Sequence, residues 1–177
     1  CLYTVVKNYS LFTVDPREYT VGVTPFSIVA TLVAADCTDV GFLVGFRRKE
    51  AHQADFNDYS DLVGLGGIAT VAGGTPDGDL ISTNGILNGA ATVTTSTGVV
   101  PADGVSYQLS VFVAMDGTVT ARVNGVEYPV YSTGTTALVL DAGDIFVPFL
   151  RQINIGGGDP DAVVSELVSV NTDTWFA

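Results

Sequence analysis

The sequence has few of the residues that build helices and few positive charges. Among its 177 residues there are two lysines, four glutamates, one methionine and one histidine. Lysine, glutamate and methionine are good helix formers, so their scarcity predicts little helix. Twenty glycines, together with many valines and threonines, favour strands joined by tight turns instead.

Positive charge is too scarce for binding to a polyanion. Seven lysines and arginines stand against nineteen aspartates and glutamates, which gives a net charge of −12. Nucleic acids and anionic membranes are held by basic surfaces, so we expect neither as a partner. The sequence also contains no apolar run of about 20 residues, the length that crosses a bilayer.

Cysteine and histidine are nearly absent, which limits the chemistry of a site. Cys1 and Cys37 could form one disulfide or remain two free thiols, and their spacing does not match a zinc site. A Ser-His-Asp or Cys-His site would have to use His52. This histidine lies in a polar segment and no nucleophile-elbow motif is present, so we interpret it as a surface or packing residue.

The glutamates do not pair as a glycosidase requires. None of them has an acidic neighbour two residues along a predicted strand, and they are far apart at Glu18, Glu50, Glu127 and Glu166. We therefore predict that the protein is not an enzyme.

A cluster of aspartates gives weak candidates for calcium ligands. Asp55, Asp58 and Asp61 follow one another at three-residue spacing, and calcium takes oxygen ligands from such loops. The cluster does not match a calcium-loop motif, and solvated turn aspartates are the more ordinary interpretation. We predict no cofactor and keep calcium as the alternative.

The basic run Arg47, Arg48 and Lys49 stands alone in an acidic sequence. Three residues are too few for a nucleic-acid footprint. They could pair with the nearby aspartates of the same molecule, or contact an acidic face of a neighbouring subunit. The sequence leaves both readings open.

The most regular pattern lies between residues 105 and 130. Apolar and polar residues alternate there in three runs, separated by Asp116-Gly117 and Asn124-Gly125. Period two predicts strands with one buried face, so the segment is a three-strand meander. Asn-Gly predicts a two-residue type I′ turn that pairs Val123 with Val126. At the other break, a three-residue loop of residues 116–118 would pair Met115 with Val119.

Further apolar runs bring the expected number of strands to about ten or more. They include residues 26–34, 40–46, 145–155 and 163–170, with residues 36–39 read as a hairpin loop. Pro148 within one run predicts an edge or a bulge. The pattern predicts an all-β fold with little helix, an antiparallel two-sheet β-sandwich.

Residues 49–62 are the one region without strand periodicity. We expect a short helix there, or a loop that crosses a sheet. No proline- or serine-rich linker divides the chain, so residues 1–177 are assigned to a single domain.

Residues 42–170 resemble a family of tailed-bacteriophage virion proteins with a concanavalin A-like jelly-roll fold. The segments that carry the resemblance are 45–55, 57–61, 86–92, 102–104, 119–125 and 141–149. The most specific stretch is GFRRKEAHQADFNDYSD, residues 45–61. Residues 1–40 and 64–79 carry little of the resemblance, and we expect them to be contact-making extensions or insertions.

The resemblance implies a non-enzymatic structural protein located in the virion. Its expected role is a capsid-surface or decoration protein, or another head component. The implied partners are a major capsid protein and further copies of the chain itself.

The alternative function is a carbohydrate-binding, lectin-like module, with a phage appendage as one setting. It is favoured by the strand pattern and by aromatic residues that could stack on a sugar, namely Tyr59, Tyr131 and Trp175. A glycoside hydrolase is the less favoured alternative, because a carboxylate pair is missing.

Overall fold

The structure is a computed structural model that describes residues 18–34, 40–53, 56–66, 81–102, 104–154 and 162–171. Its elements are β1 (Tyr19–Thr20), β2 (Phe26–Ala34), β3 (Val40–Arg48), the 3-10 helix η1 (Phe56–Asp58), β4 (Leu62–Gly66), β5 (Ile81–Ile86), β6 (Val93–Val99), β7 (Ser106–Val113), β8 (Val119–Val123), β9 (Val126–Tyr128), β10 (Tyr131–Thr133), β11 (Thr136–Ala137), β12 (Ile145–Asn154) and β13 (Ala162–Asn171).

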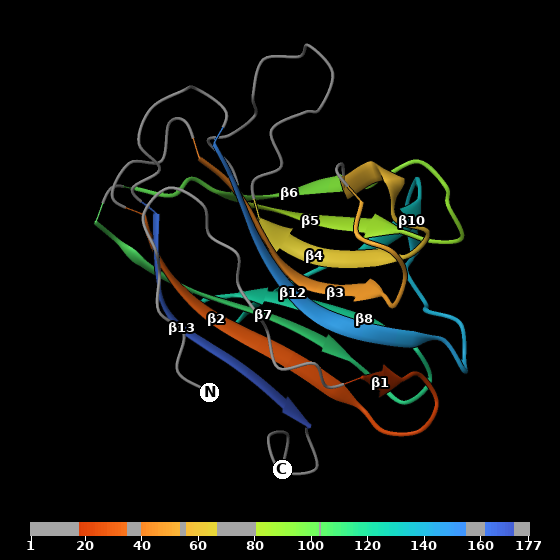
Figure 1. Cartoon of the computed structure of the whole chain (residues 1–177). Helices are drawn as coiled ribbons and strands as arrows, with labels where there is room; N and C mark the ends of the chain where they lie inside the picture. The colour runs from red at the N-terminus through yellow and green to blue at the C-terminus, as the bar shows by residue number, and fades with distance from the viewer. Residues whose placement is uncertain are drawn as a thin grey trace.

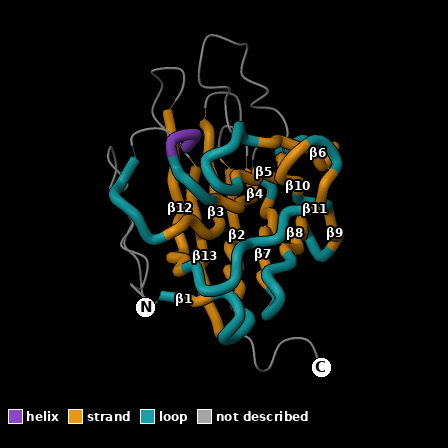
Figure 2. Tube along the Cα trace, turned by 90° about the vertical axis from the view of Figure 1, so that its right-hand side faces the viewer, coloured by secondary structure: helices purple, strands orange, loops and turns teal. Residues whose placement is uncertain are grey.

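Two antiparallel sheets lie one on the other (Figure 1). The six-stranded sheet has the order β1-β12-β3-β4-β5-β6, and the five-stranded sheet has the order β13-β2-β7-β8-β9. A small hairpin of β10 and β11 lies near β6 and β9 (Figure 2). The predicted all-β sandwich is confirmed.

The main core lies between the sheets and is built from the alternating apolar positions of their strands. Phe26 of β2, Phe46 of β3 and Phe146 of β12 are fully buried there. The rings of Phe26 and Phe46 meet edge to face, with 4.8 Å between their centroids. Because one phenylalanine comes from the five-stranded sheet and two from the six-stranded sheet, this aromatic contact ties the two sheets together.

The meander is confirmed, with one error in register. Asn124 and Gly125 have φ values of 50° and 81°, and Val123 pairs with Val126, as a type I′ turn requires. The other loop lies one residue earlier than predicted, at residues 115–117, so Val119 pairs with Val113 instead of Met115.

The three-residue loop between β7 and β8 is Met115, Asp116 and Gly117. The Gly117 amide donates to the Ala114 carbonyl at 3.0 Å, and the Ala114 amide donates to the Thr118 carbonyl at 2.8 Å. Gly117 has a φ of 84°, the left-handed conformation that follows a type I turn in such hairpins. Glycine therefore occupies the last position of the loop, and Met115 lies exposed within it.

The predicted hairpin at residues 36–39 is also wrong. β2 belongs to the five-stranded sheet and β3 to the six-stranded sheet, so the connection between them passes from one sheet to the other. Residues 35–39 themselves lie outside the described residues. The two apolar runs are neighbours in sequence, but each pairs with strands far along the chain.

Pro148 lies where its missing amide proton is tolerated. It pairs with Phe46 of β3, while the described part of β1 reaches only Ile145 and Phe146 on the other side of β12. Beyond Phe146, this side of β12 is an open edge among the described strands. The expectation of an edge position at Pro148 is confirmed.

Candidate functional site

The segment between β3 and β4 packs on the outer face of the six-stranded sheet. Side chains alternate along β3, so Phe46 points into the main core and Leu43 points outward. Phe56 and Tyr59 of the segment lie over this outer face. They form a second buried cluster, here called the satellite core, with four strand residues: Leu43, Leu62, Ile86 and Phe149.

Glycines on the outer face leave room for the satellite core. Gly45 of β3 and Gly64 of β4 are paired and buried. A Cβ atom on Gly64 would lie 2.8 Å from Cδ1 of Leu43, and one on Gly45 would lie 2.0 Å from the carbonyl oxygen of Val63. The missing side chain of Gly64 therefore leaves room for Leu43 of the satellite core, and that of Gly45 lets the backbones of β3 and β4 approach each other. The prediction of a short helix or a loop across a sheet is confirmed, since η1 lies in this segment.

Polar contacts hold the segment in one shape. Glu50 accepts hydrogen bonds from the amide of Ser60 at 2.8 Å and from its hydroxyl at 3.0 Å. The guanidinium of Arg47 lies 5.2 Å from the centroid of the Tyr59 ring and donates to the carbonyl of Glu50. The hydroxyl of Tyr59 accepts from the amide of Gln53. Both ends of the segment are thus fixed to each other and to β3.

A buried carboxylate joins the segment to its neighbours. Asp61 is 1% exposed and accepts from Nη1 of Arg48 at 3.0 Å and from the amide of Asn88 at 2.7 Å. The other guanidinium nitrogen of Arg48 lies 2.7 Å from Asp144. Asn88 in turn donates its side-chain amide to Asp141 at 3.0 Å.

Several turns meet at this end of the sandwich, here called the tied end. The amide of Gly89, in the β5–β6 turn, donates to the carbonyl of Ser60 at 2.7 Å. The amide of Val21, after β1, donates to the carbonyl of Asp144, and the amide of Gly143 donates to the carbonyl of Val21. The β5–β6 turn is therefore bonded to the segment before β4, and the residues after β1 are bonded to those before β12.

The basic run is used within the molecule. Arg48 pairs with Asp61, which confirms one of the predicted internal partners. Lys49 pairs with Glu18 at 2.5 Å, and Arg47 lies over Tyr59. These contacts support the internal reading of the run, and a contact to another subunit stays a prediction.

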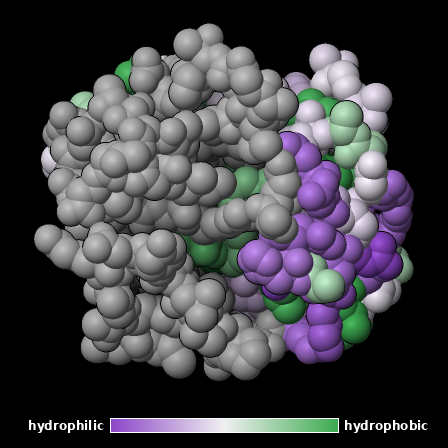
Figure 3. Space-filling model, turned by 45° about the horizontal axis from the view of Figure 1, so that its top comes forward, coloured by the Kyte–Doolittle hydropathy of each residue, from purple (hydrophilic) through white to green (hydrophobic). Residues whose placement is uncertain are grey.

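The polar side chains that remain at the surface form the candidate site. His52, Asn57 and Asp58 are exposed, and Gln53 is half-buried. The hydroxyl of Thr92, just before β6, donates to Oδ1 of Asn57. We call these five residues the loop surface. In Figure 3, hydrophilic residues form a continuous area on the described part of the molecule.

The predicted calcium candidates do not come together as a set in the described residues. Asp61 is engaged with Arg48 and Asn88, Asp58 is exposed, and Asp55 lies outside the described residues. Within the described ranges, no group of three histidine, cysteine, aspartate or glutamate side chains is close enough together to hold a metal ion. Cys1 and Cys37 lie outside these ranges.

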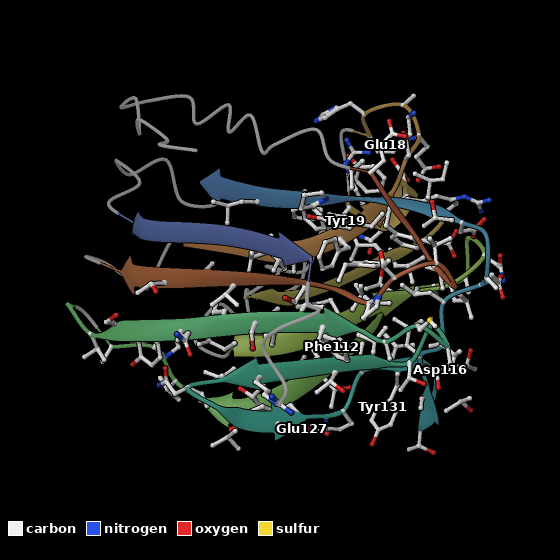
Figure 4. The ribbon with its side chains drawn as sticks, turned by 90° about the horizontal axis from the view of Figure 1, so that it is seen from below. Glu18, Tyr19, Phe112, Asp116, Glu127 and Tyr131 are labelled. Atoms are coloured by element: carbon white, nitrogen blue, oxygen red, sulfur yellow. The ribbon has the colours of Figure 1, made fainter. Side chains whose placement is uncertain are left out.

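The predicted stacking aromatics have different surroundings. Tyr59 is 4% exposed and belongs to the satellite core, so its ring face is not open to a sugar. Tyr131 of β10 is half-buried, and Figure 4 shows its ring pointing away from the sheets. Trp175 lies outside the described residues.

Sequence reasoning missed the satellite core. Phe56 and Tyr59 stand three residues apart inside an otherwise polar segment, which is the spacing of one face of a helical turn. That spacing was the available signal. Which sheet the two aromatic residues cover depends on the strand order. The sequence of the segment does not reveal that order.

Similarity to known proteins is seen in the structure alone. No family model matches the chain, and no curated protein sequence matches it. The described part contains no helix long and apolar enough to cross a membrane.

Two of the solved structures that match this chain have TM-scores above 0.5. An alginate lyase from Pseudomonas aeruginosa is 16% identical, with a TM-score of 0.54, over 93% of this chain and 77% of that chain. Sheep galectin-11 in complex with glycerol is 12% identical, with a TM-score of 0.51, over 90% of this chain and 100% of that chain. At these identities the likeness concerns the fold alone. The chain therefore has the two-sheet jelly-roll fold seen in galectin-like lectins, and nothing in the comparisons points to a virion protein.

Proposed function

We propose that the protein is a non-enzymatic, lectin-like module that binds neutral glycans on its loop surface. The observation that carries the proposal is the fixed shape of the segment between β3 and β4. Its exposed amide, imidazole and hydroxyl groups are held on a satellite core and a hydrogen-bonded frame. The sandwich fold, shared with sheep galectin-11, supports the same reading.

A fixed surface favours binding of a weakly interacting ligand. Sugars offer hydroxyl groups that already bond well to water, so the net gain from each hydrogen bond is small. A surface that loses little side-chain and loop freedom on binding keeps more of that gain. Glu50, Ser60 and Arg47 supply this order before any ligand arrives.

The charges of the site favour a neutral glycan over an acidic one. Among the described residues, Arg47, Arg48 and Lys49 are the cations of the segment, and each already faces a π system, a carboxylate or a carbonyl of the same molecule. An acidic sugar would also approach a protein with a net charge of −12. Its carboxylate would lose hydration without gaining a free cation among these residues.

The described glutamates support a non-enzymatic role. Glu18 pairs with Lys49, Glu50 binds Ser60, and Glu127 pairs with Arg122. Each of these carboxylates thus has its own structural partner. A glycosidase would need two of them to face one bond, about 5 to 10 Å apart.

A glycan array tests the proposal directly. Neutral and acidic glycans are probed at physiological salt, with calcium and with a chelator. We expect neutral hits that do not depend on calcium. A double variant, H52A with Q53A, should weaken these hits at least about tenfold, the loss of roughly 1.4 kcal/mol.

The double variant keeps the backbone bond from Gln53 to Tyr59, so the loop frame stays intact. The matched control is S106A, an exposed serine at the start of β7 on the other sheet, which should leave binding unchanged. An array without hits would overturn the proposed function, and hits unaffected by the double variant would place the site elsewhere.

The location of the protein stays a prediction from the sequence resemblance. We propose the surface of a phage particle, as a decoration protein or within an appendage, where weak glycan contacts from many copies would add up. Mass spectrometry of purified particles tests this, and absence of the chain from them would contradict it.

A further inference from the structure

We propose that β6 is a self-association edge, through which two copies of the chain pair antiparallel and join their six-stranded sheets into one. The inference concerns a surface separate from the glycan proposal and does not depend on it. It rests on how the edge strands of the two sheets differ.

β6 is hydrogen-bonded to one strand among the described elements, and β10 of the small hairpin lies close to it without pairing. β6 pairs with β5, and Figure 1 shows β6 as the outermost strand of the six-stranded sheet. Thr94 and Ser96 are exposed on it. An edge strand offers a row of backbone donors and acceptors to another strand unless a structural device prevents it.

The other edges of the two sheets are blocked, beginning with β1, which is only two residues long. β9 is only three residues long, contains Glu127 (Figure 4) and is followed by Pro129. The open side of β12 contains Pro148, and β13 contains Glu166 beside a register shift. Proline, charge and bulges are the usual means of blocking strand addition.

β6 has neither charge nor proline. No charged residue stands between Asp79 and Asp103, so the whole strand and both flanks are neutral in a protein with a net charge of −12. Its one irregularity is at its end, where Ser82 pairs with Ser96 but Ile81 pairs with Val99. This leaves residues 93–96 as the regular stretch available for pairing.

A second copy of the chain fits this edge better than a different partner. A two-fold pairing brings the same neutral stretch together from both sides, so it is self-complementary and places no like charges face to face. It sets Thr94 and Ser96 of one copy beside the same residues of the other, and threonine and serine are favourable cross-strand partners. Every contact between two copies has to overcome the repulsion of their net negative charge, and the neutral β6 stretch adds no local like-charge contact to it.

Sedimentation velocity across a concentration range of about 1 µM to 1 mM measures the association. We expect a reversible dimer of the wild-type chain that strengthens when salt is raised, because salt screens the repulsion between the two acidic molecules. Two variants, T94K and S96K, place a charge on the edge and should each weaken the dimer at least about tenfold.

The matched control is S106K, which adds the same charge at an exposed position of β7 on the other sheet and should leave the dimer intact. Thermal unfolding of each variant confirms that it is folded. Hydrogen exchange gives an independent readout, since the outward amides of β6 should exchange more slowly at high concentration than at low. A wild-type chain that stays monomeric throughout, or a dimer of equal strength in both lysine variants, would overturn the inference.

Discussion

At the scale of single residues, Asp61 joins β3 to the β5–β6 turn at the tied end. It bonds to Arg48 of β3 and to the backbone of Asn88 in the β5–β6 turn, while only 1% of it is exposed. A buried carboxylate that accepts from a guanidinium and an amide holds both donors in place. Removing its charge leaves these donors without an equivalent acceptor.

The D61N variant tests this role. The side-chain amide can accept from only one of the two donors, and its NH2 group faces the other. We expect the free energy of unfolding to fall by about 1.5 to 3 kcal/mol, the range for hydrogen bonds to charged groups. The measurement is urea unfolding. D58N, on the exposed side of the same segment, should change stability by less than about 0.5 kcal/mol. Equal losses in both variants would contradict the role.

Asp116 gives a second residue-scale prediction, on pH. Its side chain accepts from the amide of Thr118 at 2.9 Å, and this hydrogen bond lowers the pKa of Asp116 below 3.8 in the folded state. A carboxyl whose pKa is lower when folded adds stability above its unfolded pKa, and this contribution is lost as pH falls through the folded value.

The D116A variant should therefore melt at a lower temperature than the wild type at pH 7. The difference between the two should shrink as pH drops below 3.8. Thermal unfolding followed by circular dichroism over this pH range is the measurement. A difference that is independent of pH would show that the turn depends on something other than the ionised carboxylate.

At the scale of elements, the satellite core decides whether the segment between β3 and β4 stays on the sheet. Phe56 is 2% exposed, and the centroid of its ring lies 6.1 Å from that of Phe149 on β12. The main core lies on the other face of the same sheet and does not include either ring. The two clusters should therefore respond separately to a substitution.

The F56A variant tests whether the satellite core and the main core respond separately. Removing a buried phenylalanine destabilises by about 3 to 5 kcal/mol, and here we expect the loss to appear first as local opening of the segment. Hydrogen exchange should accelerate at the amides of Tyr59 and Ser60 and stay unchanged in β7.

The control for F56A is V126A, which shortens an apolar side chain that is 57% exposed. It should leave exchange in the segment unchanged. Equal acceleration in β7 and in the segment of the F56A variant would mean that the two clusters unfold together.

At the scale of the whole molecule, periodicity predicted where the strands lie better than it predicted which strands pair with each other. The alternation between residues 105 and 130 labels one face of each strand, and Asn124-Gly125 fixes a turn, so this meander was predictable from local chemistry. Residues 26–34 are nearly all apolar or small, and residues 40–46 alternate only between apolar residues and glycine or leucine, so neither run has a polar face. A strand without a labelled face gives no sign of which sheet it enters.

Around the candidate site, contacts between residues close in sequence could be predicted, but contacts between distant strands could not. A pair of Arg48 and Asp61 was one of the alternatives that the sequence left open, because the two are close in sequence and opposite in charge. Asp144 is 96 positions away from Arg48 and reaches it only because β12 lies beside β3. Contacts set by strand order cannot be read from a local pattern.

The same strand order shapes how the chain reaches its fold. β12 is inserted between β1 and β3, with Phe146 between Tyr19 and Arg48, and β13 pairs along the whole of β2. Pairing of this kind joins the first third of the chain to the last, which raises contact order and slows folding. During synthesis, β2 and β3 have to wait with open edges until the C-terminal strands emerge, and that interval is when aggregation competes with folding.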